Sequence, residues 1–206
     1  MSYTKTLIAN MAMVHIGDRD IADIDDQFDT DALVLKRFYI HARNAIYEAH
    51  DWKWAKRAVE LQLLPAAPVV RYTRAFQMPS EFRRIANVSE FSDMRMQLND
   101  FDISNGQFNC DVGFCHMEYV SSDWSEAVWP AYFADCVSLK LAALCAPRIT
   151  HDSTAKQVLE KLLRDATLPY ARSIDSGSQP PNKRVISSPW QTARMGGRNF
   201  NNLRRY

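Results

Sequence analysis

Cysteine and histidine are the side chains of this sequence best suited to bind zinc or to act as nucleophile and base. The cysteines are separated by four, twenty and eight residues, at Cys110, Cys115, Cys136 and Cys145. This spacing matches neither a CxxC zinc pattern nor the disulfide framework of a small secreted protein. A zinc site at Cys110, Cys115 and His116 would need a distant fourth ligand and has no standard spacing. We therefore interpret the cysteines as reduced, mostly buried thiols, with Cys136 and Cys145 inert on an apolar helix.

The motifs that hold phosphates, nucleophiles or catalytic metals are missing. The sequence contains no Walker loop, GxGxxG, GxSxG or HExxH. The histidines are scattered and are interpreted as packed or surface residues, at His15, His41, His50, His116 and His151. We expect no catalytic, cofactor or metal site, and therefore no enzyme. An enzyme with an unrecognised site is the alternative, and it requires these histidines to converge with carboxylates in one cleft.

Negative charge is concentrated between residues 18 and 31, which contain seven aspartates and one arginine. Calcium binding is one interpretation, but an EF-hand loop needs a central Gly and a Glu at its twelfth position, and this segment has neither. We expect an acidic loop in which Asp29 or Thr30 caps the next helix. Three interleaved apolar side chains should anchor it, namely Ile21, Ile24 and Phe28.

The last 34 residues, 173–206, are rich in Pro, Gly and Asn and carry no carboxylate after Asp175. From Ser176 onward they hold six basic residues and no carboxylate, which leaves 19 basic against 24 acidic side chains in residues 1–175. The net charge of +1 therefore hides an acidic body and a basic arm. Trp190 and Phe200 give this arm apolar anchors for a partner. A frayed terminus is the alternative.

Helical periodicity predicts about four helices. The first covers about residues 3–16 and ends at Gly17, and the second covers 31–50. The third opens at Trp129-Pro130, is apolar all round and should stop before Pro147. Asp152 or Ser153 should cap the last helix, which continues through Leu168.

Strand-like alternation appears only between the second and third helices. Residues 59–63 and 69–72 read as a hairpin-like pair with a proline-rich link. Asn105-Gly106 predicts a tight hairpin, and residues 114–120 read as the last strand. The predicted class is α+β, mainly α, with the helical bundle in residues 1–57 and 124–172. An antiparallel β-domain is inserted at 58–123, and an extended basic arm follows at 173–206. No window is apolar enough to span a membrane.

Several short motifs follow one another along nearly the whole chain. They are Ile16-Gly17, residues 47–55 (YEAHDWKWA), 76–79 (FQMP), 82–85 (FRRI), 117–120 (MEYV), 129–133 (WPAYF) and 188–194 (SPWQTAR). In this order and spacing the chain resembles the head-to-tail adaptor family of short-tailed bacteriophages, also called tail tubular protein A-like. Asp51 stands where members of that family often carry Pro.

The resemblance implies a structural virion protein in the neck of the phage tail, assembled in the host cytoplasm. It implies a ring of twelve copies between the portal protein and the tail nozzle protein, with genomic DNA passing through the lumen during ejection. We predict that the arm docks on the portal through Trp190, Arg194, Arg198 and Phe200. We expect five aspartates to face the channel or a neighbouring subunit, and these are Asp18, Asp20, Asp23, Asp25 and Asp26. The alternative function is a nucleic-acid-binding protein that grips phosphates with the basic arm.

Overall fold

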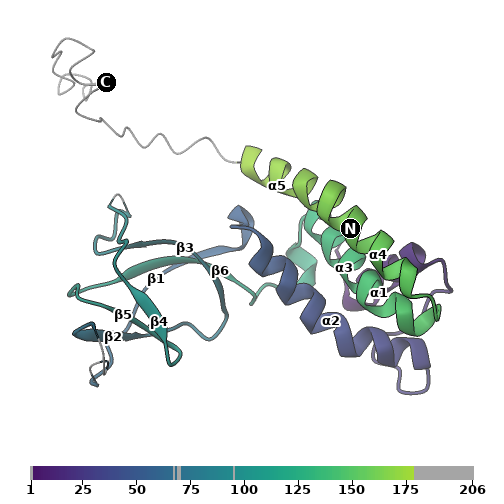
Figure 1. Ribbon diagram of the computed structural model, residues 1–206, viewed down its shortest axis with the longest axis horizontal. Coiled ribbons are helices and arrows are strands. Elements are labelled where there is room, and N and C mark those ends of the chain that lie inside the picture. The colour runs from purple at the N-terminus through teal and green to yellow at the C-terminus, as the bar shows by residue number, and fades with distance from the viewer. Residues whose placement is uncertain (1, 67, 69–70, 95, 179–206) are drawn as a thin grey trace, which may run out of the picture.

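The structure is a computed structural model and describes residues 2–66, 68, 71–94 and 96–178. In this part of the chain, helices form one unit and two small sheets form another beside it (Figure 1). The helices are α1 (Lys5–Ile16), α2 (Thr30–Ala49), α3 (Ala131–Ile149), α4 (Ser153–Leu162) and α5 (Leu168–Gly177). A π-helical turn, Leu163–Thr167, joins α4 and α5 into one continuous rod. The expected α+β class, mainly α with about four helices, is confirmed.

The helix ends follow local sequence signals. The Thr4 hydroxyl accepts the Leu7 N–H at the start of α1, and Gly17 ends that helix with a φ of 82°. The Asp29 carboxylate caps α2 and the Asp152 carboxylate caps α4, each accepting the N–H two residues further on. Of the two capping residues expected at each of these helices, the aspartate is therefore the one used.

α3 is the central helix of the bundle. It packs against α1, α2, α4 and α5, which explains why its sequence is apolar on nearly every face. The expected stop before Pro147 is wrong, because α3 continues to Ile149. Pro147 lies in the last turn, where its missing N–H removes one hydrogen bond. The Thr150 N–H still donates to the Ala146 carbonyl at 2.9 Å and closes the helix.

The π-helical turn corrects the rotation between α4 and α5. Leu159 and Leu163 are buried before or within it, and Ala171 and Asp175 are buried after it. In an uninterrupted α-helix, positions twelve residues apart such as 159 and 171 would point about 120° apart. The wider turn absorbs most of this angle, so both pairs face the bundle.

The strands form two three-stranded antiparallel sheets within the described ranges, in the orders β1-β6-β3 and β2-β5-β4. The strands are β1 (Lys56–Glu60), β2 (Arg74–Gln77), β3 (Phe82–Ser89), β4 (Asp102–Ser104), β5 (Gln107–Cys110) and β6 (His116–Ser121). The predicted hairpin at Asn105-Gly106 is confirmed, because both residues have positive φ, 53° and 71°, and β4 pairs with β5 around them.

The expected hairpin between residues 59–63 and 69–72 is wrong on its first side, because Val59 and Glu60 pair with β6 and Leu63 bridges Phe76; residues 69 and 70 lie outside the described residues. β1 instead pairs with β6, with Lys56 opposite Val120. This distant pairing makes β6 the middle strand of its sheet and buries Met117 completely. Alternation of apolar and polar residues identifies a strand but not its partner, so the local hairpin was the wrong choice.

The two units have separate apolar cores. The core of the β-domain consists of Leu61, Phe76, Val88, Phe108, Cys110, Cys115, Met117 and Tyr119. The core of the bundle ends beside the β-domain in a cluster of rings, Tyr47, Trp52, Trp54, Trp129 and Phe133. Arg84 of β3 joins the two units, since it donates to the Asp51 carboxylate and to the Glu48 carbonyl. Asp51 is thus a link between bundle and β-domain.

Candidate interaction site

The acidic loop, residues 18–29, connects α1 to α2 at the end of α2 far from the β-domain (Figure 1). It is fixed to α1 by the Asn10 side chain, whose Nδ2 donates to the Ile21 carbonyl at 3.1 Å and whose Oδ1 accepts the Ile21 N–H at 3.0 Å. Ile21 and Ile24 are each 3% exposed, so the prediction that they anchor the loop is confirmed. The loop is therefore an ordered surface of the bundle.

The aspartates of the loop make local contacts in place of a shared site. Asp23 accepts the Thr6 hydroxyl and the Asp25 N–H, both at 3.1 Å. The Asp25 carboxylate pairs with the Lys36 ammonium at 2.8 Å, and this contact lowers the pKa of Asp25. Within the described ranges, no group of three or more His, Cys, Asp or Glu side chains is arranged to hold a metal ion.

Phe28 does not anchor the loop, and this part of the prediction is wrong. Its side chain is 96% exposed. Its N–H donates to the Asp26 carboxylate at 2.8 Å, and the next residue, Asp29, already caps α2. Between these two turns the backbone is fixed while the ring lies in solvent. Two isoleucines were enough to anchor the loop, so the third apolar residue is left on the surface.

A groove lies between α2 and α3 near the same end of the bundle. Its lining is apolar at Val34, Phe38, Leu144 and Pro147 and basic at Arg37 and Arg148. Its volume is about 300 Å³. A second hollow shares Val34, Arg37 and Arg148 and extends the groove to Asp31, Leu33 and His151. Sequence reasoning missed this surface because its two walls are more than a hundred residues apart in the chain.

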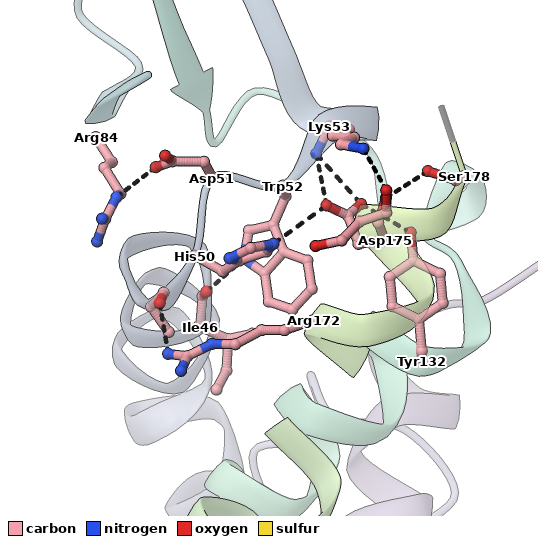
Figure 2. Close-up of polar contacts among 12 residues, drawn as sticks. Ile46, His50, Asp51, Trp52, Lys53, Arg84, Tyr132, Arg172, Asp175 and Ser178 are labelled. Carbon is pink, nitrogen blue, oxygen red and sulfur yellow. Dashed lines mark hydrogen bonds and ion pairs between the residues drawn. The ribbon is translucent and has the colours of Figure 1, made fainter. Parts of the chain in front are cut away.

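The base of the C-terminal segment is held by a buried carboxylate. Asp175, near the end of α5, is fully buried, and its oxygens accept the Lys53 backbone N–H at 3.0 and 3.2 Å. They also accept the Tyr132 hydroxyl at 3.1 Å and lie 3.3 Å from Nε2 of His50 (Figure 2). The Ser178 hydroxyl donates to the Asp175 carbonyl at 2.6 Å. We call the residues His50, Lys53, Tyr132 and Asp175 the Asp175 cluster.

The Asp175 cluster corrects the expected start of the arm. The segment was expected to be extended from residue 173, but α5 runs to Gly177 because Asp175 is drawn into the bundle. Arg172 adds a second tie, since its Nη2 donates to the Ala49 carbonyl at 2.7 Å. The end of α5 is thus fixed to the end of α2 and to the start of the β-domain (Figure 2). Residues 179–206 continue from this point, so the predicted contacts Trp190, Arg194, Arg198 and Phe200 lie outside the described residues.

Burial controls protonation in the Asp175 cluster. Burial lowers the pKa of His50, and this effect outweighs the neighbouring Asp175 carboxylate, which acts in the opposite direction. Burial and the same carboxylate raise the pKa of Tyr132. At neutral pH both groups are therefore neutral donors to Asp175. With its oxygens already occupied by such donors, Asp175 is suited to hold elements together.

The histidines and cysteines do not assemble into one site. His50 is the one histidine at ion-pair distance from a carboxylate in the part of the chain that the structure describes, and the others lie on separate elements. All four cysteines are buried, as predicted. Burial raises the pKa of Cys136 and of Cys145 to about 12, which makes these thiols poor nucleophiles.

No helix of the described chain is long and apolar enough to cross a bilayer. No known protein-family model matches the sequence, and no curated protein matches it either.

Proposed function

We propose that this protein is a structural adaptor of a short-tailed phage virion. In this role twelve copies form a ring between the portal protein and the tail nozzle, and genomic DNA passes through the lumen. The observation that carries the proposal is the architecture, a four-helix bundle whose chain is interrupted by a β-domain with its own core. The resemblance implies this combination.

The attachment of the C-terminal segment supports the same role. A docking arm transmits force to its subunit only when its base is fixed. Here the base is fixed by Asp175, with contacts to α2, α3 and the start of the β-domain. The arm adds six positive charges and Trp190, a combination suited to a partner with apolar pockets and carboxylates. Ordering such a segment on a partner costs conformational entropy, which burial of Trp190 and pairing of arginines offset.

The test is co-assembly with the portal protein of the candidate phage. The full chain and a truncation after Ser178 are each mixed with portal and separated by size exclusion with light scattering. Ser178 is the right end point because an earlier cut would remove contacts of Asp175 and confuse unfolding with loss of docking. The full chain should co-elute with portal and the truncated chain should not.

Single substitutions refine this test. Trp190→Ala should weaken portal binding by about 2 kcal/mol, or about thirtyfold in Kd, as expected for a buried aromatic anchor. Trp190→Phe should retain most of the binding. Unchanged co-assembly of Trp190→Ala would sink the proposed role of the arm.

The same samples test the nucleic-acid alternative. A basic arm that grips phosphates loses affinity steeply as salt rises, whereas docking through an aromatic anchor depends less on salt. If the full chain shifts with DNA, loses that shift in salt and never joins the portal, the nucleic-acid function replaces the adaptor.

A further inference from the structure

Phe28 is the most exposed large apolar side chain of the described chain, at 96%. It lies in a loop with six aspartates and a single arginine between residues 18 and 29. An isolated phenyl ring in water at an ordered position contributes nothing to the core of its own bundle. Such a ring is suited to bury itself in another molecule.

The loop presents Phe28 in a prepared position. Asn10 and the two buried isoleucines hold the loop on α1, and the Asp26 and Asp29 turns fix the backbone on both sides of Phe28. Asp25 is tied to Lys36 of α2 at 2.8 Å. Because little remains to be ordered, binding through Phe28 has a small entropic cost.

The α2–α3 groove has the complementary chemistry. Its lining is mainly apolar and its volume of about 300 Å³ has room for a phenyl ring. Arg37 and Arg148 of its lining are exposed, and neither guanidinium has a hydrogen bond or ion pair with another residue of the described ranges. An occupant of this groove should therefore combine an aromatic side chain with neighbouring carboxylates. Phe28, with the Asp26 carboxylate beside it, has this combination, whereas Asp29 is already paired with Arg19 of the same loop.

We infer that Phe28 of one copy enters the α2–α3 groove of a second copy of this chain, with the loop aspartates facing Arg37 and Arg148. The 96% exposure of Phe28 shows that it does not occupy the groove of its own chain. Every copy carries both the ring and the groove, so the contact joins identical chains. Used in one direction it builds a ring or filament, and used reciprocally it builds a dimer.

Charge separates this surface from the patch around a second exposed phenylalanine, Phe114. Phe114 is 66% exposed, beside a hollow lined by Leu61, Leu63, Phe76 and Glu60. That hollow has no arginine in its lining and cannot attract the acidic loop. Phe114 is therefore a matched control, an exposed aromatic without a charge-complementary groove.

The experiment measures self-association of the full chain by sedimentation velocity over a concentration series. The average mass should rise with concentration, and rise less in high salt because the Asp–Arg contacts are screened. Phe28→Ala should weaken self-association at least about tenfold, as expected for an aromatic anchor. Arg37→Glu with Arg148→Glu should have a similar effect, whereas Phe114→Ala should leave self-association unchanged. A monomeric wild-type chain at every concentration, or Phe28→Ala behaving as wild type, overturns the inference.

Cross-linking locates the contact. A chain with Gln27→Cys, which keeps the Phe28 ring, and a differently tagged chain with Phe38→Cys are mixed and oxidised, and the mixed disulfide should form. Phe114→Cys with Phe38→Cys should not form it, and the native cysteines are buried and cannot substitute. Equal yields from both mixtures overturn the inference even if the chain self-associates.

None of these variants changes the arm, so portal binding is measured independently of self-association. A chain that self-associates through Phe28 but ignores the portal refutes the adaptor function and leaves this inference standing.

Discussion

The two ends of α2 use carboxylates in opposite ways. At its start, the acidic loop gathers several aspartates, which form turns, cap the helix and pair with exposed cations. At its end, about 30 Å away along a helix of 20 residues, one carboxylate, Asp175, is fully buried among donors from α2, α3 and the chain leading to β1. The first group is conspicuous in the sequence, and the second is a single residue without a local motif.

The comparison teaches that the contribution of a carboxylate to stability depends more on its burial than on the number of carboxylates nearby. An exposed aspartate replaces contacts with water by contacts with a nearby partner, so the pair adds little to the stability of the fold. Removing a buried carboxylate leaves several donors without an acceptor, and each of these has a desolvation cost. We therefore expect the loop to matter for contacts with other molecules and the Asp175 cluster to matter for the fold.

The largest effect should come from deleting Ala166, an exposed residue of the π-helical turn. Without the extra residue the turn becomes α-helical and α5 rotates by about 100°, which takes Asp175 and Ala171 out of the bundle. We expect a loss of at least about 3 kcal/mol, the cost of breaking a buried charged network. The measurement is urea unfolding followed by tryptophan fluorescence. Ala166→Ser, which keeps the residue count, should unfold near the wild-type midpoint.

Asp175→Asn should come second. The amide keeps the shape of the carboxylate, but it replaces one acceptor oxygen by a donor that faces the Lys53 N–H or the Tyr132 hydroxyl. We expect the free energy of unfolding to fall by about 2 kcal/mol, in the range for an unsatisfied buried group. Asp20→Asn, in the acidic loop, is the matched control and should leave stability unchanged. Equal effects of the two substitutions would contradict the distinction between the two ends of α2.

The fold was predictable wherever its signals are local. Gly17, Asp29 and Asp152 mark helix ends by their own chemistry, and Asn105-Gly106 demands positive φ at two successive residues. These signals need no knowledge of the remaining chain, which is why the helices and one hairpin were predicted near their observed positions. Pro147 is the exception, because packing of α3 against the other helices keeps the chain helical beyond the hydrogen bond that the proline removes.

The contacts that unite distant segments were not predictable. The Asp175 carboxylate meets Lys53 across 122 residues, and β1 finds its partner in β6 and not in the next strand-like segment. The α2–α3 groove was not predictable for the same reason, because its two walls are far apart in the sequence. The prediction that Phe28 anchors the loop failed for a different reason. An apolar residue in a polar loop is normally assumed to be buried, and only the fold shows which of the three apolar residues of this loop is exposed.

A smaller effect is expected from pH, because His50 has a lowered pKa in the folded chain. In the unfolded chain its pKa returns to about 6.5, so below that value the unfolded state binds more protons than the folded state. Stability should therefore be full above about pH 6.5 and fall as the pH decreases toward the lowered pKa of His50. Urea midpoints between pH 7.5 and pH 5.5 measure this slope. His50→Gln retains a donor toward Asp175 and should flatten the slope.

The smallest effect on stability should come from Asp25→Asn in the acidic loop. The Asp25–Lys36 pair is exposed on both sides and is screened by water and salt, so the urea midpoint should stay within error of the wild type. Lys36→Gln should give the same result from the other side of the pair. A clear loss of stability in either variant would mean that the loop stabilises the bundle. It would contradict the assignment of stability to the Asp175 cluster and of intermolecular contacts to the loop. If stability is unchanged while the mass distribution in sedimentation shifts, the charge at this end acts between molecules and not within one.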